Sequence, residues 1–190
     1  MDQTAFRVQA LQIIERWPEW RWIPEGYMQL RWTFAGKCQE AASGDVVDED
    51  VHIVWSQSYR VPVLYMHLSH SDGASFTVEE AFDFVSRNQM ASSSSLGDPW
   101  SFLTKTEHPV LGVPFLHVHP CRTPDLMALF AREGSAAPLF TWLSLVMSLI
   151  GVRVPGAVAS AFVQEGPAAN GRSEEGDDGL PPDELTFPAP

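Results

Sequence analysis

Cysteine is scarce in this chain, which has 190 residues and only two cysteines, Cys38 and Cys121. Two distant cysteines exclude a small fold stapled by several disulfides. The first ten residues, MDQTAFRVQA, also lack the basic and then apolar layout of a signal peptide. We therefore expect two free thiols in a reducing compartment, and a soluble, cytoplasmic protein.

Positive charge is scarce as well, because 12 Lys and Arg face 24 Asp and Glu, a formal net charge of −12. So acidic a chain lacks the basic surface that binds a phosphate backbone, so we expect no nucleic acid partner. The negative charge also disfavours anionic membrane surfaces. The longest apolar run, residues 139–150, is too short to cross a bilayer, so we expect no membrane span.

The negative charge is concentrated at the C-terminal end, where seven acidic residues and one arginine follow residue 156. The same stretch is rich in Gly, Pro, Ala and Ser, a composition that cannot bury a core. The rest of the chain has enough apolar residues for one domain with a substantial core. We therefore expect one domain over residues 1–155 and a disordered acidic tail over residues 156–190.

The spacing of apolar residues predicts an α+β fold. Helical spacing occurs at residues 3–17, from 78 to about 85, at 123–130 and at 139–150. Strand signals occur at residues 27–34, 51–59, 60–68 and 113–118, and loops are expected at 17–26, 36–50 and 88–104. Runs of strands followed by helices are typical of an antiparallel sheet, here of about four strands or more, flanked by helices.

The candidate reactive residue is Cys121, in the stretch VPFLHVHPCRTPDLMALF. An apolar run ends at His119-Pro120, and Thr123 and Pro124 then suit the cap and first turn of a helix. The positive end of that helix and a nearby imidazolium, from His117 or His119, would favour thiolate over thiol. These features point to a nucleophilic cysteine.

Three other interpretations of Cys121 remain open. The residue could be a small buried hydrophobe, as we expect for Cys38. The spacing His117-x-His119-x-Cys121 could bind zinc, although Pro120 interrupts the strand and no second pair of ligands completes the site. A Cys-His hydrolase is the third interpretation, but no local signature of a cysteine protease surrounds the residue.

Three further side chains are candidates for the same site. His108, in Glu107-His108-Pro109, fits a turn residue hydrogen-bonded to the backbone, with direct chemistry as the alternative. Tyr59 and Tyr65 fall on strands expected to neighbour the strand that leads to Cys121. Core packing with a satisfied hydroxyl group competes with a role in the site for both tyrosines.

Three separated blocks carry a resemblance to a known family: SYRVPVLYMHLSHSDG, EHPVLGVPFLHVHPCRTPDLM and TWLSLVMSLIGVRVP. In this order they resemble the autophagy-related protein ten family of E2-like conjugating enzymes, over roughly residues 51–155. The sister E2-like enzyme, which passes a modifier to phosphatidylethanolamine, also carries the His-Pro-Cys tripeptide, but the EHPVLG lead-in and the WLS block favour the protein-conjugating enzyme. One departure is Met147-Ser148, which stands where the family pattern has Gly-Pro near the last helix.

The resemblance implies an E2-like core and a reaction. Cys121 would accept a ubiquitin-like modifier (autophagy-related protein twelve) as a thioester from an ATP-using E1-like enzyme. It would then transfer the modifier to a lysine of the acceptor, autophagy-related protein five. The resemblance implies neither a metal nor an organic cofactor for this enzyme. Two alternative functions stay open: a non-catalytic adaptor that binds the modifier or the acceptor, and the sister E2-like enzyme that transfers a modifier to phosphatidylethanolamine.

The resemblance leaves the partner of the oxyanion open, because the asparagine that ubiquitin E2 enzymes use has no counterpart before Cys121. His119 is our first candidate for this supporting role. The family implies a tyrosine on the strand block, where Tyr59 is favoured over Tyr65. His117 and His108 complete the set of candidate catalytic residues.

Overall fold

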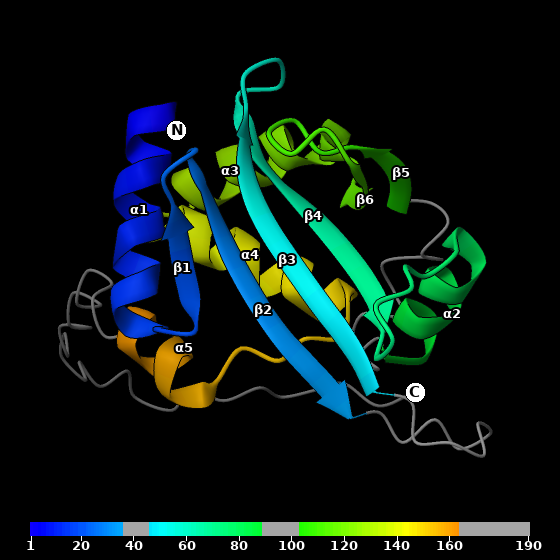
Figure 1. Cartoon of the computed structure of the whole chain (residues 1–190). Helices are drawn as coiled ribbons and strands as arrows, with labels where there is room; N and C mark the ends of the chain where they lie inside the picture. Colours follow the sequence, from blue (N-terminus) through cyan, green and yellow to red (C-terminus); the bar gives the residue numbers. More distant parts are fainter. Residues whose placement is uncertain (36–45, 89–102, 164–190) are drawn as a thin grey trace, which may run out of the picture.

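The computed structural model describes residues 1–35, 46–88 and 103–163, which form one antiparallel sheet with helices packed against it (Figure 1). The elements along the chain are α1 (Gln3–Arg16), β1 (Trp20–Ile23), β2 (Tyr27–Ala35), β3 (Val46–Ser56), β4 (Val61–His70), α2 (Val78–Asn88), β5 (Leu103–Glu107), β6 (Pro114–Val118), η3 (Pro120–Arg122), α3 (Thr123–Arg132), α4 (Pro138–Leu149) and α5 (Gly156–Val163). The prediction of an α+β fold is confirmed.

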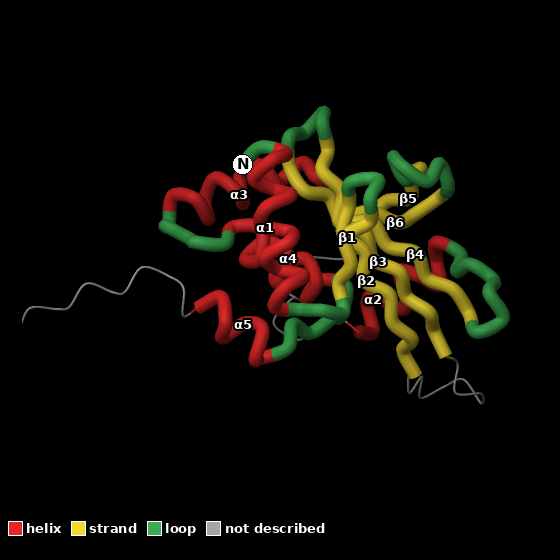
Figure 2. The backbone as a smooth tube through the Cα atoms, turned by 60° about the vertical axis from the view of Figure 1, so that its left-hand side comes forward, coloured by secondary structure: helices red, strands yellow, loops and turns green. Residues whose placement is uncertain are grey.

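The six strands lie in the order β1-β2-β3-β4-β6-β5, and every neighbouring pair is antiparallel. Helices α1, α3, α4 and α5 lie on one side of this sheet (Figure 2). Strand β4 pairs with β3 along its whole length but with β6 only at Tyr65 and Met66. Pro62, which lacks an amide donor, therefore sits where β4 has no hydrogen-bonded neighbour on the β6 side.

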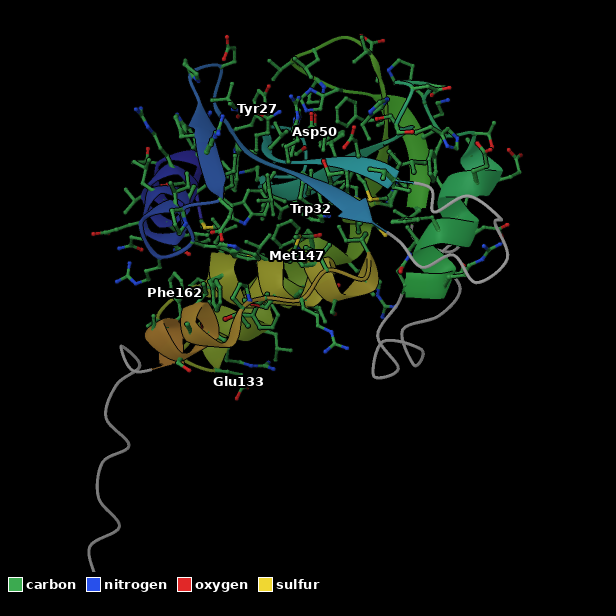
Figure 3. All side chains as sticks on the ribbon, turned by 60° about the horizontal axis from the view of Figure 1, so that its bottom comes forward. Tyr27, Trp32, Asp50, Glu133, Met147 and Phe162 are labelled. Carbon is green, nitrogen blue, oxygen red and sulfur yellow. The ribbon has the colours of Figure 1, made fainter. Side chains whose placement is uncertain are left out.

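The core lies between the sheet and α4, which is buried on nearly all sides. Strand alternation sends Met28, Leu30 and Trp32 of β2 toward this core. Figure 3 shows Trp32 and Met147 between sheet and helix, and Tyr27 and Asp50 on the opposite side of the sheet. Met147 and Ser148 lie inside α4, which runs without a break through the position where the family pattern has Gly-Pro.

Several elements confirm the sequence predictions. The reciprocal hydrogen bonds of the capping box start α2, because Thr77 N donates to Glu80 Oε2 and Glu80 N donates to Thr77 Oγ1. Helix α3 follows the cysteine as expected. However, its N-cap is Arg122 with no side-chain cap, so the prediction that Thr123 caps this helix is wrong by one residue.

Two predicted loops contain strands. Strand β1 lies inside residues 17–26, where Trp20 and Trp22 alternate toward the core and pair with β2. The prolines at positions 18 and 24 are typical of loops, so the alternation of Trp20 and Trp22 between them was not recognised as a strand. Strand β3 begins at Val46, so the acidic part of the predicted 36–50 loop is paired with β2.

The predicted 88–104 loop ends earlier than expected, because β5 begins at Leu103 and pairs with β6. The five residues of β5 show too little alternation of apolar and polar side chains to be recognised as a strand from the sequence alone. The rest of that loop prediction, the start of the 36–50 loop and the prediction for Cys38 concern residues outside the described ranges.

The prediction of a disordered tail from residue 156 is wrong at its start, where residues 156–163 form helix α5. Val158 and Phe162 are buried there, and the ring of Phe162 stacks on Phe140 of α4 with centroids 4.0 Å apart. The high Gly, Ala and Ser content of this segment concealed two apolar anchors four residues apart. The prediction for residues 164–190 lies outside the described part of the chain.

Candidate active site

Cys121 is an exposed free thiol in the short η3 turn that joins β6 to α3. Both η3 and α3 contact β4, so the cysteine segment is held against the sheet. Pro120 is buried, and the backbone N–H of Cys121 donates to His119 Nδ1 at 3.2 Å. The predicted position of the cysteine, after a strand and directly before a helix, is confirmed.

The contact with the Cys121 backbone determines the tautomer of His119. Because Nδ1 accepts a hydrogen bond, the proton of the neutral ring must lie on Nε2. His119 is exposed, so this Nε2–H is a donor available to a bound reactant. In this state the ring can support a developing negative charge but cannot accept a proton at Nε2.

His117 has the opposite tautomer. Its Nδ1 lies 3.1 Å from the Thr104 carbonyl oxygen and 3.0 Å from the Thr104 hydroxyl oxygen. Because the carbonyl oxygen can only accept, the proton of His117 is on Nδ1, and the hydroxyl oxygen is a second acceptor. Burial lowers the pKa of His117 below its ordinary value, His119 lowers it further, and the bond to Thr104 offsets part of this effect. At neutral pH His117 is thus uncharged with an accepting lone pair on Nε2.

The two candidate tyrosines reach different histidines. Tyr65 of β4 lies directly opposite His117 in the sheet and stacks on it, with ring centroids 5.7 Å apart. Burial raises the pKa of Tyr65, so its hydroxyl group stays protonated. The expected adjacency of this strand to the cysteine strand is confirmed.

Tyr59 lies in the turn between β3 and β4 rather than on the predicted strand, which ends at Ser56. Its ring is 48% exposed and meets His119 edge-on, with centroids 6.2 Å apart. Arg60 closes this turn with φ 56°, in the left-handed region that non-glycine residues rarely occupy. Tyr59 is therefore the tyrosine that lies beside the histidine bonded to Cys121.

His108 is buried in the connection between β5 and β6, and it is hydrogen-bonded to the backbone as predicted. Its Nδ1 accepts from the backbone N–H groups of Val110 and Leu111, at 3.2 and 3.1 Å. Burial first and the neighbouring His52 second lower the pKa of His108 to about 4, so the ring is neutral at physiological pH.

Sequence reasoning missed Asp50 and His52, which pack beside His108 on the face of the sheet away from α4. Their signal was alternation, since Asp48, Asp50 and His52 recur every second residue in the segment predicted as a loop and strand. This outer face of the sheet is partly covered, because Tyr27 and His52 on it are buried.

Among the described residues, no three His, Cys, Asp or Glu side chains are grouped to hold a metal ion, and this includes His117, His119 and Cys121. Within residues 1–35, 46–88 and 103–163, no helix is long and apolar enough to cross a membrane. The described side chains therefore assemble a cysteine site bordered by two histidines of opposite tautomer and two tyrosines.

Comparison with known proteins identifies relatives of this site. The chain is 32% identical to the human ubiquitin-like-conjugating enzyme ATG10 over 132 residues, covering 67% of this chain and 59% of the human protein. It is 35% identical to the protein of the same name from Arabidopsis thaliana over 116 residues, covering 56% of this chain and 50% of the relative. For the Dictyostelium discoideum protein of that name the identity is 27% over 117 residues, with coverages of 54% and 50%.

The matched segments span about half the length of these curated relatives. The family model described as autophagocytosis associated protein, active-site domain, matches residues 5–156, which include every element from β1 to α4 and the whole cysteine site. These matches confirm the resemblance drawn from the three sequence blocks. The chain therefore belongs to the family of autophagocytosis associated proteins that carry the active-site domain.

Proposed function

We propose that this protein is an E2-like enzyme that carries a ubiquitin-like modifier as a thioester on Cys121 and transfers it to a lysine of an acceptor protein. The observation that carries this proposal is the exposed Cys121 thiol on a turn whose backbone is bonded to His119. Relatives named ubiquitin-like-conjugating enzymes support the assignment. By analogy, the donor is an E1-like activating enzyme, the modifier is autophagy-related protein twelve and the acceptor is autophagy-related protein five.

The first step is thioester exchange. The thiolate of Cys121 attacks the thioester carbonyl carbon that joins the modifier to the E1-like enzyme. A new carbon–sulfur bond forms, the old one breaks, and the thiolate of the E1-like enzyme leaves. No redox change or metal is needed, and ATP is consumed only upstream by the activating enzyme.

The second step is aminolysis. A neutral lysine amine attacks the thioester carbonyl carbon, the carbonyl oxygen becomes an oxyanion, and the Cys121 thiolate then leaves as the isopeptide bond forms. The exposed His119, whose Nδ1 accepts from the Cys121 backbone, offers its Nε2–H as a hydrogen-bond donor suited to the oxyanion. The amine must lose a proton, and the lone pair on His117 Nε2, four residues before Cys121, is our candidate acceptor for it.

Tyr59 is our preferred tyrosine in this site because it contacts the ring of His119. Its exposed edge-on position can orient that ring and border the path of the incoming amine. Tyr65 stacks on His117 and is half-buried, which suits a supporting residue behind the site.

Incubation with an E1-like enzyme, modifier and ATP tests the proposal. We expect an adduct on Cys121 that reducing agent cleaves, a reductant-resistant oxyester with Cys121→Ser, and no adduct with Cys121→Ala. A reductant-sensitive adduct on the Cys121→Ser variant would refute the assignment. A wild-type chain that binds modifier or acceptor but never forms a thioester would instead support a non-catalytic adaptor.

A further inference from the structure

A row of polar side chains crosses the face of the sheet away from α4 and includes His117 of β6, the strand that leads to Cys121. The residues are directly opposite one another on five successive strands: Gln29, His52, Tyr65, His117 and Thr104. Side chains directly opposite one another on neighbouring strands are close enough to interact, and the rings of Tyr65 and His117 stack in this row. His117 is followed two residues later by His119, whose ring centroid lies 6.0 Å from that of His117.

His108 lies on top of this row and connects it to a buried hydrogen-bonded chain. Its Nε2 is 3.1 Å from His52 Nδ1, and His52 Nε2 is 3.0 Å from Asp50 Oδ1. The His108 ring also meets the Tyr65 ring edge-on, with centroids 5.0 Å apart. Because His52 and His108 are both buried, each nitrogen of the chain needs its partner.

The hydrogen bonds permit only one arrangement of protons along the chain. The backbone donors of Val110 and Leu111 occupy His108 Nδ1, so the proton of the His108 ring is on Nε2 and is donated to His52 Nδ1. The proton of the His52 ring is then on Nε2 and is donated to Asp50. Each ring thus dictates the tautomer of the next.

Asp50 ends the chain as a fixed acceptor. Burial alone would raise its pKa, but hydrogen bonds from His52, Arg31 and Gln29 hold the pKa at about 2. Arg31 Nη2 lies 2.6 Å from Oδ2, and Gln29 Nε2 lies 2.9 Å from Oδ1. Gln29 Nε2 and His52 Nε2 lie 3.1 Å apart because both donate to the Asp50 carboxylate, and they are not bonded to each other.

The other end of the chain holds the connection between β5 and β6. Besides its side-chain bonds, His108 N donates to the Val113 carbonyl at 2.8 Å, and Gly112 N donates to the His108 carbonyl at 2.9 Å. The connection between β5 and β6 therefore makes four hydrogen bonds with His108. An apolar residue could fill the same volume but could not make the hydrogen bonds of His52 and His108. We therefore infer that this buried pair orients the residues around it and does not only fill the core.

We propose that Asp50, His52 and His108 are positioning residues for the transfer step, which hold Tyr65 and His117 in register beside Cys121. The inference rests on the proposed transferase function. It adds three residues remote from the reacting sulfur, which act through the Tyr65–His117 stack. Misplacement of a positioned group by ~1 Å can cost about a hundredfold in rate.

Asp50→Asn is the sharpest variant, because an amide can donate to His52 Nε2 and so reverse the tautomer of that ring. His52 Nδ1 would then carry a proton that faces the Nε2–H of His108. His108→Asn is the second variant. The asparagine Oδ1 can replace Nδ1 as acceptor for Val110 and Leu111, but the donor to His52 is lost. His70→Gln, at the far end of β4, is the matched control.

The experiment combines two readouts on the full chain. Long-range ¹H–¹⁵N spectra of histidine-labelled protein should show protons on Nε2 of both His52 and His108. Thioester formation with saturating E1-like enzyme should stay within about twofold of wild type in both variants. The rate at which the preformed thioester is discharged to acceptor should fall by ~10–100-fold in each variant. The Asp50→Asn/His108→Asn double variant should be no slower than the slower single variant, because both substitutions disrupt the same chain of hydrogen bonds. His70→Gln should match wild type.

The outcomes separate this inference from the function on which it rests. If wild-type protein forms no thioester, the proposed function fails and the positioning role with it. If wild-type protein is charged but the variants discharge at the normal rate, only the positioning role is refuted. A proton on Nδ1 of either ring in the wild-type spectra would also overturn it, and this measurement needs no variant to fold.

Discussion

His119 serves the site through two nitrogen atoms with different partners. Nδ1 holds the backbone of the cysteine turn, and Nε2 offers a donor to solvent or reactant. These roles can be separated, because asparagine mimics the position of Nδ1 in histidine and glutamine mimics the position of Nε2.

We predict that His119→Asn keeps the bond to the Cys121 amide but loses the donor for the oxyanion. Its thioester should form normally and discharge about a hundredfold more slowly, the usual cost of losing one such donor. His119→Gln keeps a donor and should discharge faster than the asparagine variant. Single-turnover discharge to acceptor measures this order, and the opposite order would assign His119 to a purely structural role.

The tyrosine hydroxyl groups can be compared in the same assay. Tyr59→Phe should slow discharge by about tenfold if its hydroxyl group borders the amine path, a contribution typical of one positioned polar group. Tyr65→Phe keeps the ring that stacks on His117 and should stay within about twofold of wild type. A larger loss from Tyr65→Phe than from Tyr59→Phe would transfer the role to Tyr65.

Glu49 is a buried carboxyl group on the core side of β3, only 2% exposed. In the described part of the chain its Oε1 has no hydrogen-bond partner. Burial raises the pKa of Glu49, and although the bond from Trp32, opposite on β2, offsets part of this effect, the pKa is still about 8. The group is therefore protonated in the folded protein at neutral pH and ionised in the unfolded chain.

A raised pKa in the folded state means that stability is greatest at low pH and is lost as pH rises toward 8. We predict that the free energy of unfolding of wild type falls by about 2 kcal/mol from Glu49 between pH ~6.5 and ~8.5. Glu49→Gln should remove this decrease, and Glu133→Gln, on an exposed carboxylate, should retain it. Urea unfolding at several pH values gives the slopes, and equal slopes in wild type and Glu49→Gln would contradict the assignment.

At the scale of elements, the end of α4 is closed by Gly151, which has φ 82°. Val152 N donates to the Met147 carbonyl and Gly151 N to the Ser148 carbonyl, the hydrogen bonds of a Schellman motif. A Cβ at this glycine would come within 2.5 Å of the Asn88 carbonyl oxygen at the end of α2. Gly151 thus allows two helix ends to meet.

We predict that Gly151→Ala lowers the free energy of unfolding by about 2–4 kcal/mol, because left-handed strain and a steric clash add together. Gly134→Ala is the matched control: Gly134 has φ 74° after α3, but a Cβ there meets nothing within 4 Å. It should cost only about 1 kcal/mol. Equal losses in the two variants would show that the approach of Asn88 is relaxed at little cost.

At the scale of the whole molecule, α5 extends the folded unit beyond the predicted boundary at residue 155. Besides Phe140, the guanidinium group of Arg16 in α1 lies 5.0 Å from the Phe162 ring centroid. Helix α5 therefore contacts both the first helix and α4. We propose that the conjugating domain ends at residue 163.

Truncation tests this boundary. A chain ending at Val163 should unfold at the same temperature as the full chain and form the thioester normally. A chain ending at Pro155 exposes the apolar face covered by Val158 and Phe162 and should lose about 2–4 kcal/mol of stability. Phe162→Ala in the full chain should reproduce most of that loss. Identical melting of the two truncated chains would refute a structural role for α5.

Some of this architecture follows from local sequence alone. Periodicity predicted α1, β2, α2 and α3, and continuous apolar runs predicted β4 and α4, because each of these segments is long enough to show its own pattern. The short β1 and β5 and the Ala-rich α5 show no such period and become ordered by packing on neighbours. Their existence could be read only from the fold.

The sequence by itself predicted Cys121 as the candidate reactive residue, since a strand, Pro120, the cysteine and a helix start are adjacent in the chain. It also determined the backbone role of His108, whose partners lie two and three residues away. The tertiary structure alone decided that Asp50 and His52 belong to the same assembly. His52 and His108 are 56 positions apart, and only the pairing of β3 with β4 and of β4 with β6 brings their rings together beside the cysteine strand.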